Sequence, residues 1–99
     1  MLFNEHQSRL WNMMLKSIKN FRKGELQFFN LVAELEGTLY AGEFKNKELI
    51  ETWYDFWTPL EIWNATKGDC VTIEDVNQDL SDMESFLRNT LRYCLVSPP

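Results

Sequence analysis

The stretch Asn46–Ala65, NKELIETWYDFWTPLEIWNA, decides the fold of this chain. It holds three of the four tryptophans. Wound as an α-helix, at about 100° per residue, the stretch gathers its large apolar side chains on one broad face and its acids on the opposite side. The apolar face consists of Leu49, Ile50, Trp53, Phe56, Trp57, Leu60 and Trp63. Because large aromatic side chains bury so much area, whatever packs against this face fixes the architecture.

Length and composition place the chain among small globular proteins. Its 99 residues fit one domain, 1–99, that is large enough to build its own core. A hydrophobic content of 44%, with 14% aromatics, excludes a disordered chain. Four glycines and three prolines leave few places to turn, so a few long elements are favoured over many short strands.

Two helices are predicted before the central stretch. Asn4 caps the first one, and Gln7 reaches back in a capping-box arrangement. This helix should run to about Lys23. A second helix follows from Glu25, with apolar residues at helical spacing. Gly37 lies inside it, where the missing side chain should let a bulky ring of a neighbouring helix come close.

The other two helices complete a bundle. Asn46 caps the central helix, which should end near Thr66 and be kinked or broken near Pro59. Thr72 caps the last helix, which should run to about Leu95. Because short connections make successive helices antiparallel neighbours, the sequence predicts an all-α, up-down-up-down four-helix bundle.

Several classes of function are excluded or disfavoured. A formal charge of −5 disfavours binding to a phosphate backbone. Cys70 and Cys94 have neither CxxC spacing nor a histidine cluster, so no metal or redox site is expected. His6 is the single histidine and is far from any nucleophile. No Glu-x-x-His pair, glycine-rich phosphate loop or Gly-x-Ser-x-Gly elbow occurs, so we expect neither an enzyme nor a cofactor.

The location follows from two further absences in the sequence. The N-terminal residues have an early acid and no basic region before an apolar run, so they do not form a secretory signal. No run approaches 18 apolar residues. We therefore expect a cytoplasmic protein that does not span a membrane.

Charge is distributed unevenly along the chain. Residues 1–24 carry five bases and one acid, whereas residues 25–66 carry eight acids and two bases. The basic segment is interpreted as a solvated face that pairs with acidic neighbours, with nucleic-acid binding as the alternative. The acidic segments suit a basic protein partner.

Two acidic patches are the candidate partner-binding sites. On the last helix, three acids at helical spacing are continued by two aromatics: Asp75, Asp79, Asp82, Phe86 and Tyr93. On the central helix, a second trio lies opposite the apolar face: Glu48, Glu51 and Asp55. Aromatic anchors give affinity, and charges give speed and orientation, so this combination is typical of a binding surface. The alternative is that Phe86 and Tyr93 pack laterally against a neighbouring helix.

Three runs resemble those of a known family. They are Phe21–Gly24 (FRKG), Leu31–Glu36 (LVAELE) and Trp57–Ala65 (WTPLEIWNA). Within roughly residues 14 to 91, the chain resembles small all-helical bacterial immunity proteins of the colicin-D and contact-dependent growth inhibition type. The resemblance implies a cytosolic inhibitor that binds a toxin domain, often a basic RNase, and covers its active site.

Two other classes of protein stay open. A small acidic phage-type inhibitor that mimics nucleic acid would spread its acids over a wider face. A homodimeric structural or regulatory bundle would use the heavy aromatic face as its seam, so the free protein is expected to be a monomer or a homodimer. That seam would contain Trp53, Tyr54, Trp57 and Trp63.

Overall fold

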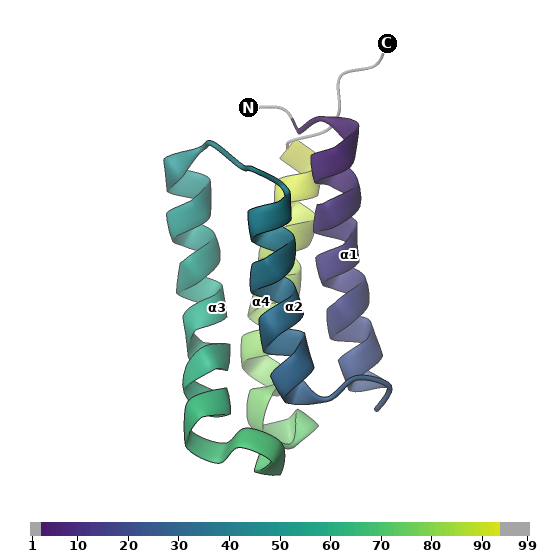
Figure 1. Cartoon of the computed structure of the whole chain (residues 1–99), viewed down its shortest axis with the longest axis vertical. Helices are drawn as coiled ribbons and strands as arrows, with labels where there is room; N and C mark the ends of the chain where they lie inside the picture. Colours follow the sequence, from purple (N-terminus) through teal and green to yellow (C-terminus); the bar gives the residue numbers. More distant parts are fainter. Residues whose placement is uncertain (1–2, 94–99) are drawn as a thin grey trace.

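The structure is a computed structural model that describes residues 3–93, and it is all-helical over that range, as predicted. Figure 1 shows its elements in chain order. The four α-helices are α1 (Glu5–Arg22), α2 (Phe28–Ala41), α3 (Lys47–Lys67) and α4 (Ile73–Tyr93). One 3₁₀ turn, η1 (Gly68–Cys70), joins α3 to α4. Cys94 and the predicted helix end at Leu95 lie outside the described residues.

Each helix packs against two others. The backbone of α1 is in contact with α2 and α4, and that of α3 is also in contact with α2 and α4. The α1–α2 connection and η1 lie at one end of the bundle, and the α2–α3 connection lies at the other end (Figure 1). Because α1 and α3 each lie beside α2 and α4 and their backbones are not in contact, they are diagonally opposite. Their outer surfaces therefore face in opposite directions.

The predicted helix starts at Asn4, Asn46 and Thr72 are confirmed. The Asn4 side chain accepts the Gln7 backbone N–H at 2.7 Å, and the Gln7 amide oxygen accepts that of Asn4 at 3.2 Å. Asn46 accepts the backbone N–H of Leu49 at 2.9 Å. These side chains satisfy backbone donors that the first turn of a helix leaves free, so local sequence alone locates these ends.

The start of α2 differs from the prediction. The helix begins at Phe28, not at Glu25. The Glu25 backbone N–H donates to Asn20 at 2.9 Å, and the Gly24 N–H donates to Phe21 at 3.0 Å. Gly24 has a φ of +79°, so these two hydrogen bonds form a Schellman cap at the end of α1. Glu25 belongs to this cap and not to α2.

Pro59 lies inside one continuous helix, so the predicted break does not occur. The bend remains a prediction. Tertiary contacts hold the chain on both sides of the proline: Leu60 is fully buried, and the Trp57 indole N–H donates to the Val32 carbonyl at 3.1 Å. These contacts offset the single backbone hydrogen bond that a proline removes.

The expected close approach at Gly37 is wrong. A Cβ atom there would have no neighbour within 4 Å, so no ring packs against it. The close contact occurs instead at Gly42, where a Cβ atom would collide with the Phe44 ring. Gly42 therefore allows this ring to fold back over the end of α2.

Tryptophans connect the helices through the core. The Trp11 indole of α1 donates to the Leu87 carbonyl of α4 at 3.0 Å. On α3, Trp53 contacts the sulfur of Met14 at 3.3 Å, and Trp63 donates to Asp79 at 3.0 Å. Trp57 donates to α2, as described above. The indole N–H of each of the four tryptophans therefore has an acceptor on another helix. Two of these tryptophans, Trp11 and Trp53, are fully buried, together with Met14, Ile18, Leu31, Leu35, Leu60, Val76, Leu80, Met83 and Leu87.

Candidate partner-binding surface

An open, largely apolar groove of about 620 Å³ lies between the first half of α3 and the second half of α4. Apolar side chains from both helices line it, and polar groups stand at its rim. The lining includes Leu49, Phe56, Asp82, Phe86, Asn89 and Tyr93. We refer to it as the α3–α4 groove. Its volume falls in the range of about 300–1,000 Å³ that is usual for binding pockets.

Phe86 packs laterally against α3, as the alternative interpretation predicted. Its ring stacks on Phe56 with centroids 4.9 Å apart and an interplanar angle of 20°. It also meets Trp11 edge-on at 6.0 Å. The ring therefore contributes to the fold while its exposed edge lines the groove.

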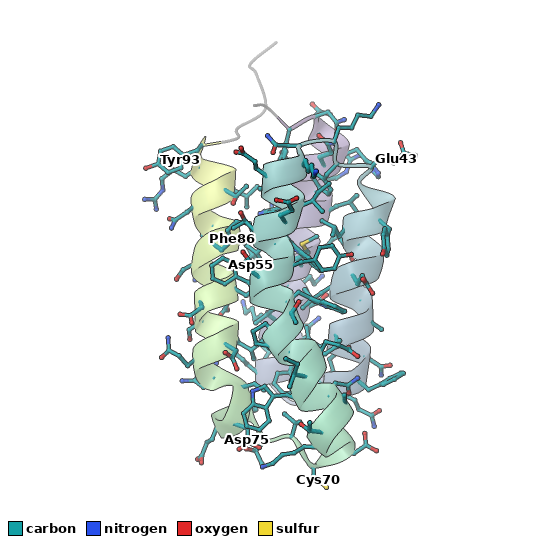
Figure 2. The ribbon with its side chains drawn as sticks, turned by 90° about the vertical axis from the view of Figure 1, so that its left-hand side faces the viewer. Glu43, Asp55, Cys70, Asp75, Phe86 and Tyr93 are labelled. Atoms are coloured by element: carbon teal, nitrogen blue, oxygen red, sulfur yellow. The ribbon has the colours of Figure 1, made fainter. Side chains whose placement is uncertain are left out.

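Tyr93 behaves differently from Phe86. It is 80% exposed and lies at the end of α4, beside the groove (Figure 2). The Tyr93 ring is therefore not packed laterally against a neighbouring helix, and it can contact another molecule.

The α4 acidic stripe, which we define as Asp75, Asp79 and Asp82, is largely occupied by contacts within the chain. Asp75 exchanges hydrogen bonds with Thr72, accepting the Thr72 backbone N–H at 3.0 Å, and pairs with Lys67 at 3.3 Å. The hydrogen bond from the Thr72 backbone, helped by Lys67, lowers the pKa of the Asp75 carboxyl below its ordinary value. Asp75 and Thr72 therefore cap the start of α4 together.

The other two members of this stripe have different surroundings. Asp79 accepts the Trp63 indole N–H at 3.0 Å and is partly buried. Asp82 is exposed, accepts a hydrogen bond from Gln78 at 2.8 Å and lines the α3–α4 groove. Among the three acids, Asp82 alone reaches the groove, and Asp75 lies towards the other end of the bundle (Figure 2).

The α3 acidic stripe, which we define as Glu48, Glu51 and Asp55, is exposed throughout. Among residues 3–93, its one ion pair joins Glu51 to Lys47 at 4.0 Å, and both side chains are largely in solvent. Glu48 and Asp55 directly precede Leu49 and Phe56, which line the groove. Figure 2 shows Asp55 and Phe86 on the same face of the molecule, on α3 and α4. Of the two predicted patches, Asp82, Phe86 and Tyr93 line the groove, whereas Glu48 and Asp55 are only sequence neighbours of its lining residues.

Sequence reasoning missed the α3 half of the groove. Leu49 and Phe56 were assigned to the broad apolar face of the central helix, but they lie at its edge and are partly exposed. Their spacing of seven residues was a usable signal, because side chains two turns apart share one line on a helix.

A tyrosine cluster between α2 and α3 was also missed. The Tyr54 hydroxyl donates to Glu36 at 2.9 Å and lies 3.3 Å from the Tyr40 hydroxyl. Partial burial, together with these hydrogen bonds, raises the pKa of the Tyr54 phenol. The phenol therefore stays protonated and remains a hydrogen-bond donor to Glu36.

The four residues of the expected homodimer seam differ in burial. Trp53 is fully buried, and the indole N–H groups of Trp57 and Trp63 bond within the chain. Tyr54, Trp57 and Trp63 are only partly buried, and a homodimer through this face stays a prediction.

Comparison with known proteins adds no assignment. No protein-family model, curated protein or solved structure matches this chain. The resemblance to immunity proteins therefore stays a prediction. Within residues 3–93, no helix combines the length and apolar character needed to cross a membrane, and no three His, Cys, Asp or Glu side chains are grouped to hold a metal ion.

Proposed function

We propose that this protein is a cytoplasmic immunity protein that binds a basic bacterial toxin domain, with a nuclease such as an RNase as the expected class. One observation carries the proposal: the exposed Asp82 of α4 lines an apolar groove on the α3–α4 face, and the exposed Glu48 and Asp55 of α3 directly precede two of its lining residues. Its role is to bind and to cover the toxin's active site, not to catalyse a reaction.

The two components of this surface have separate tasks. The exposed acids, Glu48, Asp55 and Asp82, attract a basic partner and orient it during approach. The groove then takes an apolar side chain of the partner between Phe86 and Tyr93. Buried aromatic contacts of this kind slow dissociation more than they speed association.

The proposal includes a finer description of the scaffold. The helices run up, down, up and down, and α3 bends at Pro59. Two chain connections at one end and one at the other are consistent with this order (Figure 1). A bend at Pro59 follows from the missing backbone donor of a proline inside α3.

The test requires a basic toxin domain, and the first candidate is the product of a toxin-like gene next to the gene for this protein. The α3 acidic stripe and Asp82 are changed to lysine in one variant. A control changes four exposed acids elsewhere to lysine: Glu5, Glu25, Glu34 and Glu43. Both variants have the same formal charge, so a general charge effect acts equally on both.

We expect the stripe variant to lose protection in cells that co-express the toxin domain. Its association rate should fall, most strongly at low salt, whereas the control should bind like the parent protein. If the stripe variant, with an unchanged helical spectrum and melting point, protects and binds as well as the parent at low and physiological salt, the α3–α4 face is not the interface.

A further inference from the structure

A basic stripe on α1 has the same spacing as the α3 acidic stripe. Lys16 and Lys19 of α1 and Lys23, the residue that directly follows this helix, form what we call the α1 basic stripe, with steps of three and four residues. The α3 acidic stripe has steps of three and four residues as well. In each stripe the first and last residues are seven positions apart, or about 10.5 Å along a helix at 1.5 Å per residue. Lysines and acids can therefore face one another in register when α1 of one molecule lies parallel to α3 of another.

The lysines of the α1 basic stripe are free to pair. All three are exposed, and no carboxylate among residues 3–93 lies within 4.0 Å of their Nζ atoms. They border a groove of about 610 Å³ between α1 and α4, with Leu15 in its lining. The sequence predicted that the basic segment pairs with acidic neighbours. These three lysines do not form such pairs within residues 3–93.

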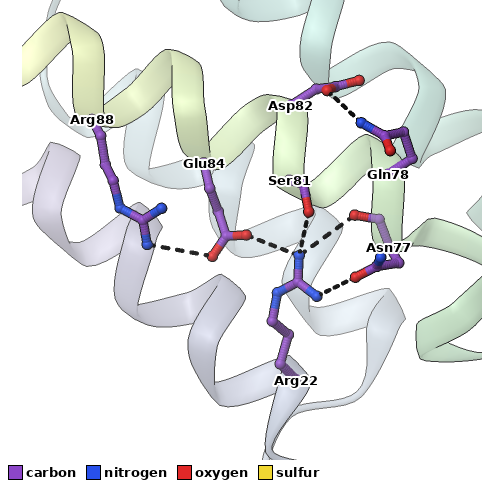
Figure 3. A network of polar contacts seen from close by, with 7 residues as sticks. All are labelled: Arg22, Asn77, Gln78, Ser81, Asp82, Glu84 and Arg88. Atoms are coloured by element: carbon purple, nitrogen blue, oxygen red, sulfur yellow. Dashed lines mark hydrogen bonds and ion pairs between the residues drawn. The ribbon is translucent and has the colours of Figure 1, made fainter.

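Glu84, the acid beside these lysines, already has arginine partners. Glu84 of α4 pairs with Arg22 at 2.9 Å and lies 3.8 Å from Arg88 (Figure 3). Arg22 also donates to Asn77 at 2.7 Å and to Ser81 at 3.2 Å. Both arginines of this groove are therefore paired with Glu84, and its three lysines make no ion pair within residues 3–93.

The two stripes lie on opposite faces of the molecule. The α1 and α3 backbones are not in contact, and each stripe points away from the core of the bundle. Figure 2 shows α3 in front and α1 behind it. One molecule therefore cannot pair its own stripes, whereas a second molecule can reach either of them.

We propose that the α1 basic stripe of one molecule binds the α3 acidic stripe of a second copy. Lys16 then faces Glu48, Lys19 faces Glu51 and Lys23 faces Asp55. The contact is heterologous, so a bound pair keeps one free acidic stripe on one molecule and one free basic stripe on the other, and the association can continue. Exposed ion pairs contribute little individually, so the contact is weak and sensitive to salt.

Charge favours a second copy over nucleic acid as the occupant. The α3 acidic stripe matches the spacing of the three lysines, whereas a net charge of −5 disfavours binding to a polyanion. A second copy is also negative overall. At 0.1 M salt, however, the screening length of about 10 Å is shorter than the bundle's width of 21 to 25 Å, so the facing stripes dominate the interaction.

This contact would compete with the proposed function. A basic partner on the α3–α4 face and a second copy both require the α3 acidic stripe. Self-association therefore covers this stripe until a partner with more contacts displaces it. The inference uses the same acids as the proposed function but does not depend on it, since it concerns the pure protein alone.

The test is the concentration dependence of the diffusion coefficient, measured by dynamic light scattering at about 50 mM salt, where the screening length is still above 10 Å. Evenly charged molecules repel one another, so their diffusion becomes faster as concentration rises. Stripe pairing should make diffusion of the parent protein slower instead, and about 0.5 M salt should abolish the slowing. Faster diffusion at every salt concentration would overturn the proposal.

Three variants identify the contact. One changes the three lysines of the α1 basic stripe to glutamate, another changes the α3 acidic stripe to lysine, and the third combines all six changes. Each single-stripe variant should lose the slowing of diffusion. The combined variant has the net charge of the parent and reversed stripes, so it should recover the slowing. A single-stripe variant that behaves like the parent, or a folded combined variant without recovery, would also overturn the proposal.

Discussion

The acidic stripes of α3 and α4 have similar spacing in the sequence but different surroundings in the fold. Asp75 and Asp79 of α4 bond to Thr72, Lys67 and Trp63, which the end of α3 and the following loop bring to them. In the part of the chain that the structure describes, the α3 acidic stripe has a single ion pair, between Glu51 and Lys47 at 4.0 Å. Helical spacing thus identifies an outer face of a helix, but the neighbouring elements decide whether its charges support the fold or remain free to bind.

The largest effect is expected from Phe86, the aromatic residue that continues the α4 acidic stripe. Replacing it with alanine removes the stack on Phe56 and the contact with Trp11. Because the ring is partly exposed, we expect a loss of about 2–3 kcal/mol in the free energy of unfolding, measured with urea. Tyr93→Ala is the control and should change stability by less than about 0.5 kcal/mol. Equal losses would remove the distinction between the two rings.

Asp79→Ala should have the next largest effect. It leaves the Trp63 indole N–H without its acceptor, and an unpaired donor costs about 1–3 kcal/mol when buried. Partial exposure lets water replace the carboxylate, so we expect a value near the lower end of that range. Asp55→Ala on α3 is the matched control and should leave the urea midpoint unchanged. A similar loss in both variants would contradict the assignment of Asp79 as a structural acid.

Asp75 should make stability depend on pH in the acid range. Its pKa is lower in the folded protein than the ordinary value of 3.8, so the ionised form stabilises the fold. This contribution is fully present above pH 3.8 and is lost as the pH falls through the lower folded value. Asp75→Asn should therefore melt at a lower temperature than the parent at pH 7. The difference should narrow towards pH 2, and a constant difference would show that Asp75 acts through its shape alone.

The smallest effect on stability is expected for the α3 acidic stripe. Single changes of its exposed residues to glutamine should each alter the free energy of unfolding by less than about 0.5 kcal/mol. Thermal unfolding of the three single variants measures this directly. A loss as large as that of Asp79→Ala would mean that the stripe has a structural partner and is not reserved for binding.

Local signals account for what could be predicted from the sequence. Asn4, Asn46 and Thr72 each bond within their own first turn, so the residues nearby are sufficient to locate these helix starts. The start of α2 was wrong by three residues because the residue after Gly24 is used by the preceding helix. Whether Pro59 interrupts its helix depends on contacts with distant residues such as Val32, which no local pattern contains.

The candidate site was predicted only in part for the same reason. Helical spacing identified both acidic stripes and the two aromatics of α4. It did not reveal the groove, because a groove depends on which helices are neighbours and on the stack of Phe56 on Phe86. Nor did it distinguish Asp82, which reaches the groove, from Asp75 and Asp79, which do not.

The four indole N–H groups of the tryptophans can serve as spectroscopic reporters of binding. Each indole N–H gives a separate NMR resonance, and each bonds to a different residue across the bundle. A ligand seated against Phe86 should shift the Trp11 resonance, because the two rings are 6.0 Å apart. Trp57, which bonds to α2, should respond less. A titration followed at these four signals would therefore locate a bound molecule on the surface without labels or mutations.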